Sequence, residues 1–187
     1  MTAPPPLVLA STSPQRRAIL EQLRIPFEVV APAYDEGPDG DPVEHALGKA
    51  RSVDGGDRPV LGVDTIVACE GRVIGKPRDA AEAERMLETL SGKTHVVVSG
   101  LCLRTPGWQE LHREETHVTF RALTPRDLSH YVASGEWRNR AGAYAIQGLG
   151  ASLVERIDGD YLNVVGLPAA LLVRLLAERF DGLYGFG

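Results

Sequence analysis

The amino-acid sequence predicts an α/β fold with a mixed β-sheet, and three observations support this expectation. Short β-rich runs alternate with segments of helical apolar spacing, several helical segments begin at a Ser, Thr or Asp cap, and turn-forming dipeptides separate the strands. The chain has 187 residues, of which 43% are hydrophobic, enough to build one core or two tightly joined lobes. We therefore expect a single domain over residues 1–187.

In the first part of the chain, residues 7–10 predict a buried strand, and Ser13 then caps a helix that Pro14 opens. The run "FEVVAP" predicts a second strand. A loop rich in Pro, Gly and Asp leads from it into a helix over about residues 42–53. Next, "VLGVDTIVACEGRVI" predicts two strands joined by a turn at Glu70-Gly71, which together form a hairpin.

The second part of the chain is assigned from the same cap and turn signals. Asp79 is expected to begin a long helix, with Glu82 as its capping-box partner. The further expected elements are a long hairpin turning at Pro106-Gly107, a helix from Thr124-Pro125, a hairpin around Asp158-Gly159, and a helix over 168–180. Strands thus alternate with helices over the whole chain, which favours a mixed sheet.

Charge and composition limit the classes of function. A net charge of −5 and a pI near 5.5 argue against a broad basic face for duplex nucleic acid, so any bound polyanion should be small. The first residues show neither a basic signal-peptide segment nor an apolar run long enough to span a membrane, and we expect a cytoplasmic protein. Cys69 and Cys102 lie far apart in no ligand-like spacing, so we interpret them as reduced core residues.

One motif suggests a different class of nucleotide-binding protein. "SGKT" at residues 91–94 ends like a P-loop, which would indicate an NTPase or a kinase. The P-loop requires a glycine five residues before Gly92, where this chain has Leu87. The predicted order is also helix, loop, strand instead of strand, loop, helix. Gly92 is better explained as the end of a helix.

The segment "LASTSPQRRAILEQL" predicts the end of a strand followed directly by the N-terminus of a basic helix. The first helical turn presents free N–H groups and the positive end of the helix dipole, and Ser11, Ser13, Arg16 and Arg17 add hydroxyls and cations around it. These groups suit a phosphate. The alternative is an ordinary Ser-Pro helix cap with a solvated basic face.

A charged residue interrupts one of the predicted strands. Asp64 lies inside "VLGVDTIVA", where an ionised carboxylate is costly unless a cation lies near it. Lys76, between Gly75 and Pro77 just after the same hairpin, is a candidate for that cation, although an exposed loop lysine is the simpler interpretation.

Four segments resemble the Maf family of nucleoside triphosphate pyrophosphatases, in the same order and over nearly the whole chain. They are "LASTSPQRRAILEQL", "GVDTIVACEGRVIGKP", "LSGKTH" and "AGAYAIQGLGASLVERIDGDYLNVVGLP". The resemblance implies an elongated mixed sheet with flanking helices, in two lobes around a cleft, similar to the ITPase-like house-cleaning enzymes. It also implies hydrolysis of a nucleoside triphosphate to the monophosphate and pyrophosphate with a divalent cation, Mg²⁺ or Mn²⁺.

The resemblance, taken with the residues themselves, implies roles in such a site. The catalytic candidates are Asp64 as proton acceptor with Lys49 and Lys76; the substrate-binding candidates are Ser11, Ser13, Gln15, Arg16, Arg17, Thr65 and Gln147; the metal candidates are Glu36 and Asp64. A carboxylate is a weak base, so Asp64 would act best on a water acidified by a bound metal. The lysines and arginines would neutralise charge that builds up on the phosphate chain.

Base selection rests on three positions. Thr65 and Gln147 match the subgroup that resembles dTTP/UTP pyrophosphatases, whereas the subgroup acting on 7-methyl-GTP has other residues there. Gln15 matches neither subgroup, which leaves room for modified nucleotides. Maf proteins are also associated with cell-division arrest, so a regulatory module that binds a nucleotide without turnover is the alternative to an enzyme, and a homodimer is left open.

Overall fold

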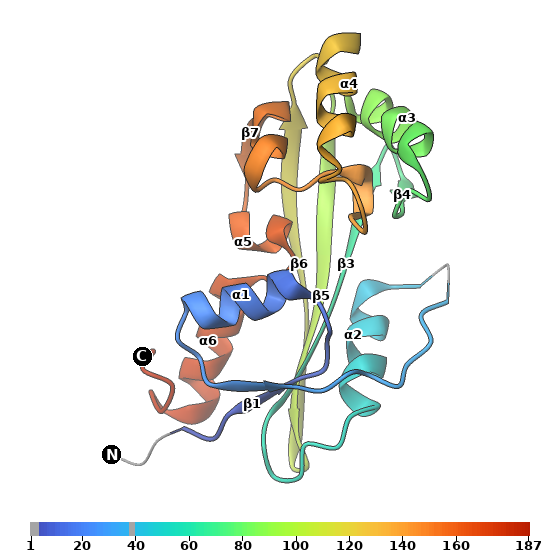
Figure 1. Cartoon of the computed structure of the whole chain (residues 1–187). Coiled ribbons are helices and arrows are strands. Elements are labelled where there is room, and N and C mark those ends of the chain that lie inside the picture. The colour runs from blue at the N-terminus through green and yellow to red at the C-terminus, as the bar shows by residue number, and fades with distance from the viewer. Residues whose placement is uncertain (1–3, 38–39) are drawn as a thin grey trace. The chain divides into compact units, whose positions relative to one another are not determined.

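The structure is a computed structural model that describes residues 4–37 and 40–187. Its strands form a mixed seven-stranded sheet in the order β2-β1-β3-β5-β6-β7, with β4 paired to β3 (Figure 1). The strands are β1 (Leu7–Leu9), β2 (Phe27–Val29), β3 (Val60–Cys69), β4 (Arg72–Ile74), β5 (Thr94–Thr105), β6 (Trp108–Phe120) and β7 (Val154–Asp158). The mixed α/β architecture expected from the sequence is confirmed.

The helices are α1 (Pro14–Gln22), α2 (Pro42–Arg51), α3 (Ala80–Leu90), α4 (Pro125–Ser134), α5 (Tyr161–Val165) and α6 (Ala169–Phe180), with short 3₁₀ helices η1 (Ala141–Ala143) and η2 (Gly148–Leu153). The predicted helices occur in the expected order along the chain, and α5 is a helix that the sequence did not predict. The chain divides into two compact units. The first comprises residues 1–64, 99–114 and 166–187, and the second comprises residues 65–98 and 115–165.

The first unit is built on parallel strands. β1 pairs in parallel with both β2 and β3, with Val8 opposite Val60 and Leu9 opposite Leu61. Side chains alternate between the two faces of each strand, and Val8, Val60 and Cys102 pack with Ala46 and Ala50 of α2 in one core cluster. Helices α1 and α6 lie on the other side of the strands from α2 (Figure 1).

Two glycines allow α2 to approach the strands unusually closely. A Cβ atom added at Gly62 of β3 would lie 2.1 Å from the Ala46 carbonyl oxygen, and one added at Gly100 of β5 would lie 2.1 Å from that of Pro42. Real Cβ atoms do not tolerate such distances, so only glycine permits this packing. The close approach brings the helix backbone onto the strands immediately beside the position of Asp64.

The second unit contains the predicted β3-β4 hairpin. Its two turn residues, Glu70 and Gly71, have φ angles of 51° and 77°, the left-handed conformation that a two-residue hairpin loop requires. Helices α3 and α4 pack beside each other over a core that includes Leu87, Phe120 and Tyr131. This core is separate from the cluster beneath α2.

Most of the predicted caps are confirmed, and one needs correction. The Ser13 hydroxyl caps α1, Thr124 forms a full capping box, and the Asp79 carboxylate accepts from the Glu82 N–H. Glu82, however, does not return to the Asp79 backbone. Its carboxylate binds the backbone N–H and the guanidinium of Arg78, because that cation four residues earlier is the stronger donor.

A second expectation is wrong: no hairpin forms around Asp158-Gly159. β7 ends at Asp158 and pairs with β6, and the chain then enters α5. The Asp160 side chain accepts a hydrogen bond from the Leu162 N–H, and its backbone N–H donates to the Thr116 hydroxyl. Asp160 therefore starts a helix where a strand was expected.

Two further expectations from the sequence are confirmed. Gly92 has a φ of 68° and lies between α3 and β5, so the order helix, loop, strand excludes a P-loop at "SGKT". Cys69 and Cys102 are free and buried, and burial raises the pKa of both thiols, that of Cys102 to about 11.

Over residues 4–37 and 40–187, no helix has both the length and the apolar character that a membrane crossing requires.

The packing of α2 makes a first prediction. Gly100→Ala should destabilise the protein by about 1–3 kcal/mol, since the new methyl group collides with the Pro42 carbonyl and forces α2 away from the strands. Gly107→Ala is the matched control, because a Cβ there meets nothing within 4 Å. Urea unfolding of the two variants measures the difference, and equal midpoints would contradict the packing described above.

Candidate active site

The turn after β1 is ordered by its own hydroxyl groups. The Ser13 backbone N–H donates to the Ser11 hydroxyl at 3.2 Å, and the Ser13 hydroxyl donates to the Gln15 side-chain carbonyl at 3.1 Å. The same Ser13 oxygen accepts from the Arg16 N–H at 3.5 Å. The predicted helix cap is therefore present, and Gln15 is an integral part of it.

Arg16 is buried at the start of α1, with 9% of its surface exposed. Its guanidinium donates to the Ser11 hydroxyl at 3.0 Å and to the Gly166 carbonyl at 2.9 Å. Burial lowers the pKa of Arg16, and the negative charges of Asp64 and Glu36 oppose that shift. Arginine stays protonated in proteins, so the turn holds a fixed cation close to two carboxylates.

Lys49 lies at the centre of the site. Its ammonium contacts Asp64 Oδ1 at 2.7 Å, Glu36 Oε1 at 2.6 Å and the Val63 carbonyl at 3.4 Å. Lys49 and Asp64 are both buried, whereas the Glu36 side chain is 44% exposed. The cation that Asp64 requires is thus supplied by α2, whereas the residues of its own hairpin suggested Lys76.

Three residues that the sequence reasoning missed hold the Glu36 loop against α2. The Tyr34 hydroxyl lies 3.1 Å from His45 Nδ1, and the two rings meet edge to face. Tyr34 rests on Gly48, where an added Cβ would be 2.2 Å from the ring. Gly48 inside a helical pattern was the available signal, since a glycine there is unfavourable without a packing reason.

The other candidates are placed separately. Arg17 is exposed on α1 in the first unit. In the second unit, Thr65 is half-buried in β3, Lys76 is exposed in the loop after β4, and Gln147 is exposed immediately before η2. The participation of these four residues in one site, like the cleft expected from the family resemblance, stays a prediction.

The donor set suits a divalent cation. Lys49 engages one oxygen each of Asp64 and Glu36, so both carboxylates already converge on a positive charge and each retains a second oxygen. Mg²⁺ is commonly held by one or two carboxylates together with substrate phosphates. Within the described residues no group of three or more His, Cys, Asp or Glu side chains is arranged for metal binding, and water or substrate phosphates would supply the other ligands.

The protein is of the mixed α/β class, and its first unit brings a Ser and Arg turn together with a buried lysine and two carboxylates. The comparison with protein families identifies it further. A family model described as "Maf-like protein" matches residues 6–179, and the chain belongs to this family.

Relatives named dTTP/UTP pyrophosphatase are similar over almost the whole chain. The protein from Moorella thermoacetica is 50% identical over 181 residues, which cover 91% of this chain and 93% of the relative. The protein from Deinococcus radiodurans is 44% identical over 190 residues, covering 98% and 96%. That from Gloeobacter violaceus is 46% identical over 183 residues, covering 94% and 96%.

The contact of Tyr34 with α2 makes a second prediction. Tyr34→Ala should speed backbone hydrogen exchange across residues 33–37, because the ring on Gly48 and the bond to His45 are both lost. Tyr34→Phe, which loses only the hydroxyl, should have a smaller effect. Tyr161→Ala, at an exposed tyrosine of the second unit, is the control. Unchanged exchange in Tyr34→Ala would show that the loop is held by other contacts.

Proposed function

We propose that this protein hydrolyses nucleoside triphosphates to nucleoside monophosphates, releasing pyrophosphate. The observation that carries the proposal is the buried Asp64–Lys49 pair beside the Arg16 turn, in a Maf-family chain whose relatives are named dTTP/UTP pyrophosphatase. A polyanionic substrate needs fixed cations, and hydrolysis needs a base that can accept a proton from water. The site contains both.

Asp64 is proposed as the proton acceptor. Its carboxylate is buried, and Lys49 holds one of its oxygens, which leaves the other free to accept a proton from an attacking water. Attack at the α-phosphorus lets pyrophosphate leave as one unit. Glu36 and Asp64 are the residues that would hold a divalent cation, Mg²⁺ or Mn²⁺, which when bound would neutralise phosphate charge and make water more acidic.

The cations are proposed to stabilise the charge that builds up on the leaving pyrophosphate. Arg16 is fixed by Ser11 and Gly166, so little reorganisation is needed when substrate binds. Lys49 is shared between two carboxylates, and a phosphate oxygen can replace Glu36, the more exposed of them. Arg17 and Lys76 are exposed and are proposed as further phosphate partners.

Thr65 and Gln147 are proposed to select uracil or thymine. A glutamine amide offers both a donor and an acceptor, matching a pyrimidine carbonyl and ring N–H.

Two other functions stay as alternatives. They are hydrolysis of 7-methyl-GTP and binding of a nucleotide without turnover, the latter linked to the cell-division arrest associated with Maf proteins.

A panel of triphosphates assayed with Mg²⁺ or Mn²⁺ for both pyrophosphate and phosphate release tests the proposal. Pyrophosphate release from UTP and dTTP is the expected result. Release of phosphate alone, or binding without release, would overturn it.

We also propose a cytoplasmic location, which cell fractionation tests. A homodimer is proposed as well, and sedimentation analysis tests it.

The role of Asp64 makes a third prediction. Asp64→Asn should lower kcat by about two to four orders of magnitude, because the amide cannot accept the proton, while UTP binding measured by calorimetry changes little. Lys49 keeps Glu36 as its partner, so the fold should survive. Asp57→Asn makes the same chemical change at an exposed position and should behave as wild type. Near-normal turnover in Asp64→Asn would remove Asp64 from the mechanism.

Base selection makes a fourth prediction. Gln147→Glu should reduce the preference for UTP and dTTP over GTP and ATP in kcat/KM, since the carboxylate loses the donor for a pyrimidine carbonyl. Gln15→Arg should sharpen the preference by adding a cation beside the nucleotide. That substitution also removes the acceptor of the Ser13 hydroxyl, which then becomes free to donate to a phosphate. If neither substitution changes the ratios, selection occurs elsewhere.

A further inference from the structure

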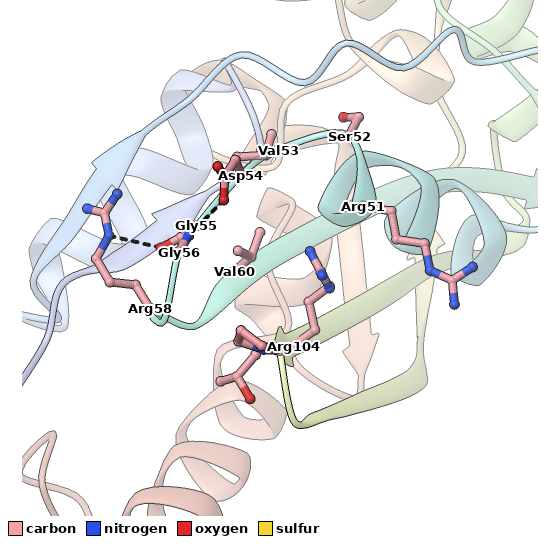
Figure 2. Close-up of a pocket in the computed structure, with 11 residues that line it drawn as sticks. Arg51, Ser52, Val53, Asp54, Gly55, Gly56, Arg58, Val60 and Arg104 are labelled. Carbon is pink, nitrogen blue, oxygen red and sulfur yellow. Dashed lines mark hydrogen bonds between the residues drawn. The ribbon is translucent and has the colours of Figure 1, made fainter.

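A cavity of about 440 Å³ opens in the first unit (Figure 2), and its described lining residues include none of the candidate active-site residues. It lies where the end of α2, the loop before β3 and the end of β5 meet. Each of the three segments contributes one arginine: Arg51 from α2, Arg58 from the loop and Arg104 from β5. Val60, at the wall of the cavity, and Asp64 lie four positions apart on β3, a span of about 13 Å along an extended strand.

Two of these arginines have no acidic partner among the residues that the structure describes. Within the described residues, Arg51 donates to the Gln109 side-chain carbonyl at 3.3 Å and Arg104 to the Ala50 carbonyl at 3.1 Å, and neither forms an ion pair. Arg58, in contrast, pairs with Glu28. Because a guanidinium has five N–H donors, most donors of Arg51 and Arg104 remain available to a ligand.

The acidic residue at the cavity does not neutralise the two arginines. The Asp54 carboxylate accepts a hydrogen bond from the Gly56 N–H at 2.9 Å, and Figure 2 shows it turned toward that loop, away from Arg51 and Arg104. Positive charge therefore accumulates here in a protein whose net charge is −5. Such a concentration of unpaired cations favours an anionic ligand.

Two observations place Arg51 and Arg104 in the same region of the first unit. Both arginines reduce the pKa of the buried Cys102 thiol, against the larger effect of burial. They also line a second hollow of about 340 Å³, which is formed with residues 105–109. The main cavity is within the size range of small-molecule pockets, and Val53 and Val60 give it apolar walls.

We propose that this arginine pocket, defined by Arg51, Arg58 and Arg104, binds a phosphate group of a small molecule, as a second anion site separate from the candidate active site. Two guanidinium groups on different segments match the several oxygens and the double charge of a phosphate better than a single carboxylate. The proposal does not depend on the proposed pyrophosphatase activity.

Titration of the full chain with pyrophosphate, followed by ¹H–¹⁵N NMR, tests the pocket. We expect saturable shifts of the Gly55 and Gly56 amides and of Arg104 Nε. In Arg51→Gln/Arg104→Gln the dissociation constant read at Gly55 and Gly56 should rise about tenfold or more. The Ser11 and Ser13 amides report the candidate active site in the same spectra, so failure of one site is distinguished from failure of the other.

Controls separate the pocket from general charge effects. Arg126→Gln/Arg156→Gln removes two exposed arginines of the second unit and should leave the titration unchanged. Parallel titrations with phosphate, UMP and uridine distinguish an inorganic ligand from a nucleotide. If the double variant does not fold, Arg51→Gln alone, at an exposed residue, provides the comparison.

Three results would overturn the proposal. They are the absence of a saturable shift at Gly55 and Gly56, an equal shift in the pocket variant, and binding of succinate as tight as that of pyrophosphate. In the second case, a lowered Tm of the pocket variant would show that the two arginines only stabilise the carbonyl end of α2.

Discussion

The candidate active site depends on one buried ammonium group. Lys49 is almost inaccessible to solvent, and a charge in that position is tolerated only with close, well-oriented partners. Asp64 and Glu36 provide them from β3 and from the loop before α2, so a single cation connects three segments of the chain. The same arrangement places a positive charge between two neighbouring carboxylates, which offsets their mutual repulsion.

The position of Lys49 follows from how α2 is packed on each of its sides. Toward the strands, Gly62 and Gly100 remove the side chains that would otherwise keep the helix away. On another side, Gly48 removes the atom that would displace the Tyr34 ring. Glycine lowers the intrinsic stability of a helix or strand, so the close packing compensates for a local cost. Geometry at the site is thus determined by the side chains that are missing as much as by those present.

The fold was predictable from the sequence wherever the signals are local. Ser13, Thr124 and the Glu70-Gly71 turn act on their own neighbours, and all three behave as expected. The partner of Asp64 was different. Lys49 lies 15 residues away on a helix whose placement depends on glycines in two strands. The apolar spacing of the sequence does not indicate a contact of this kind. The capping rule also failed for Glu82. Its carboxylate was expected to bind the Asp79 backbone N–H, but it binds Arg78 because a cation is the stronger donor.

The burial of both thiols has a practical consequence for the chemistry of this protein. Cys69 and Cys102 are the chain's two cysteines, and each has a raised pKa, so very little thiolate exists at neutral pH. Oxidants and alkylating reagents attack the thiolate, and burial also denies them access. A cysteine introduced at an exposed position would therefore be the one readily labelled thiol, so a fluorophore or spin label can be attached selectively without first removing the native cysteines.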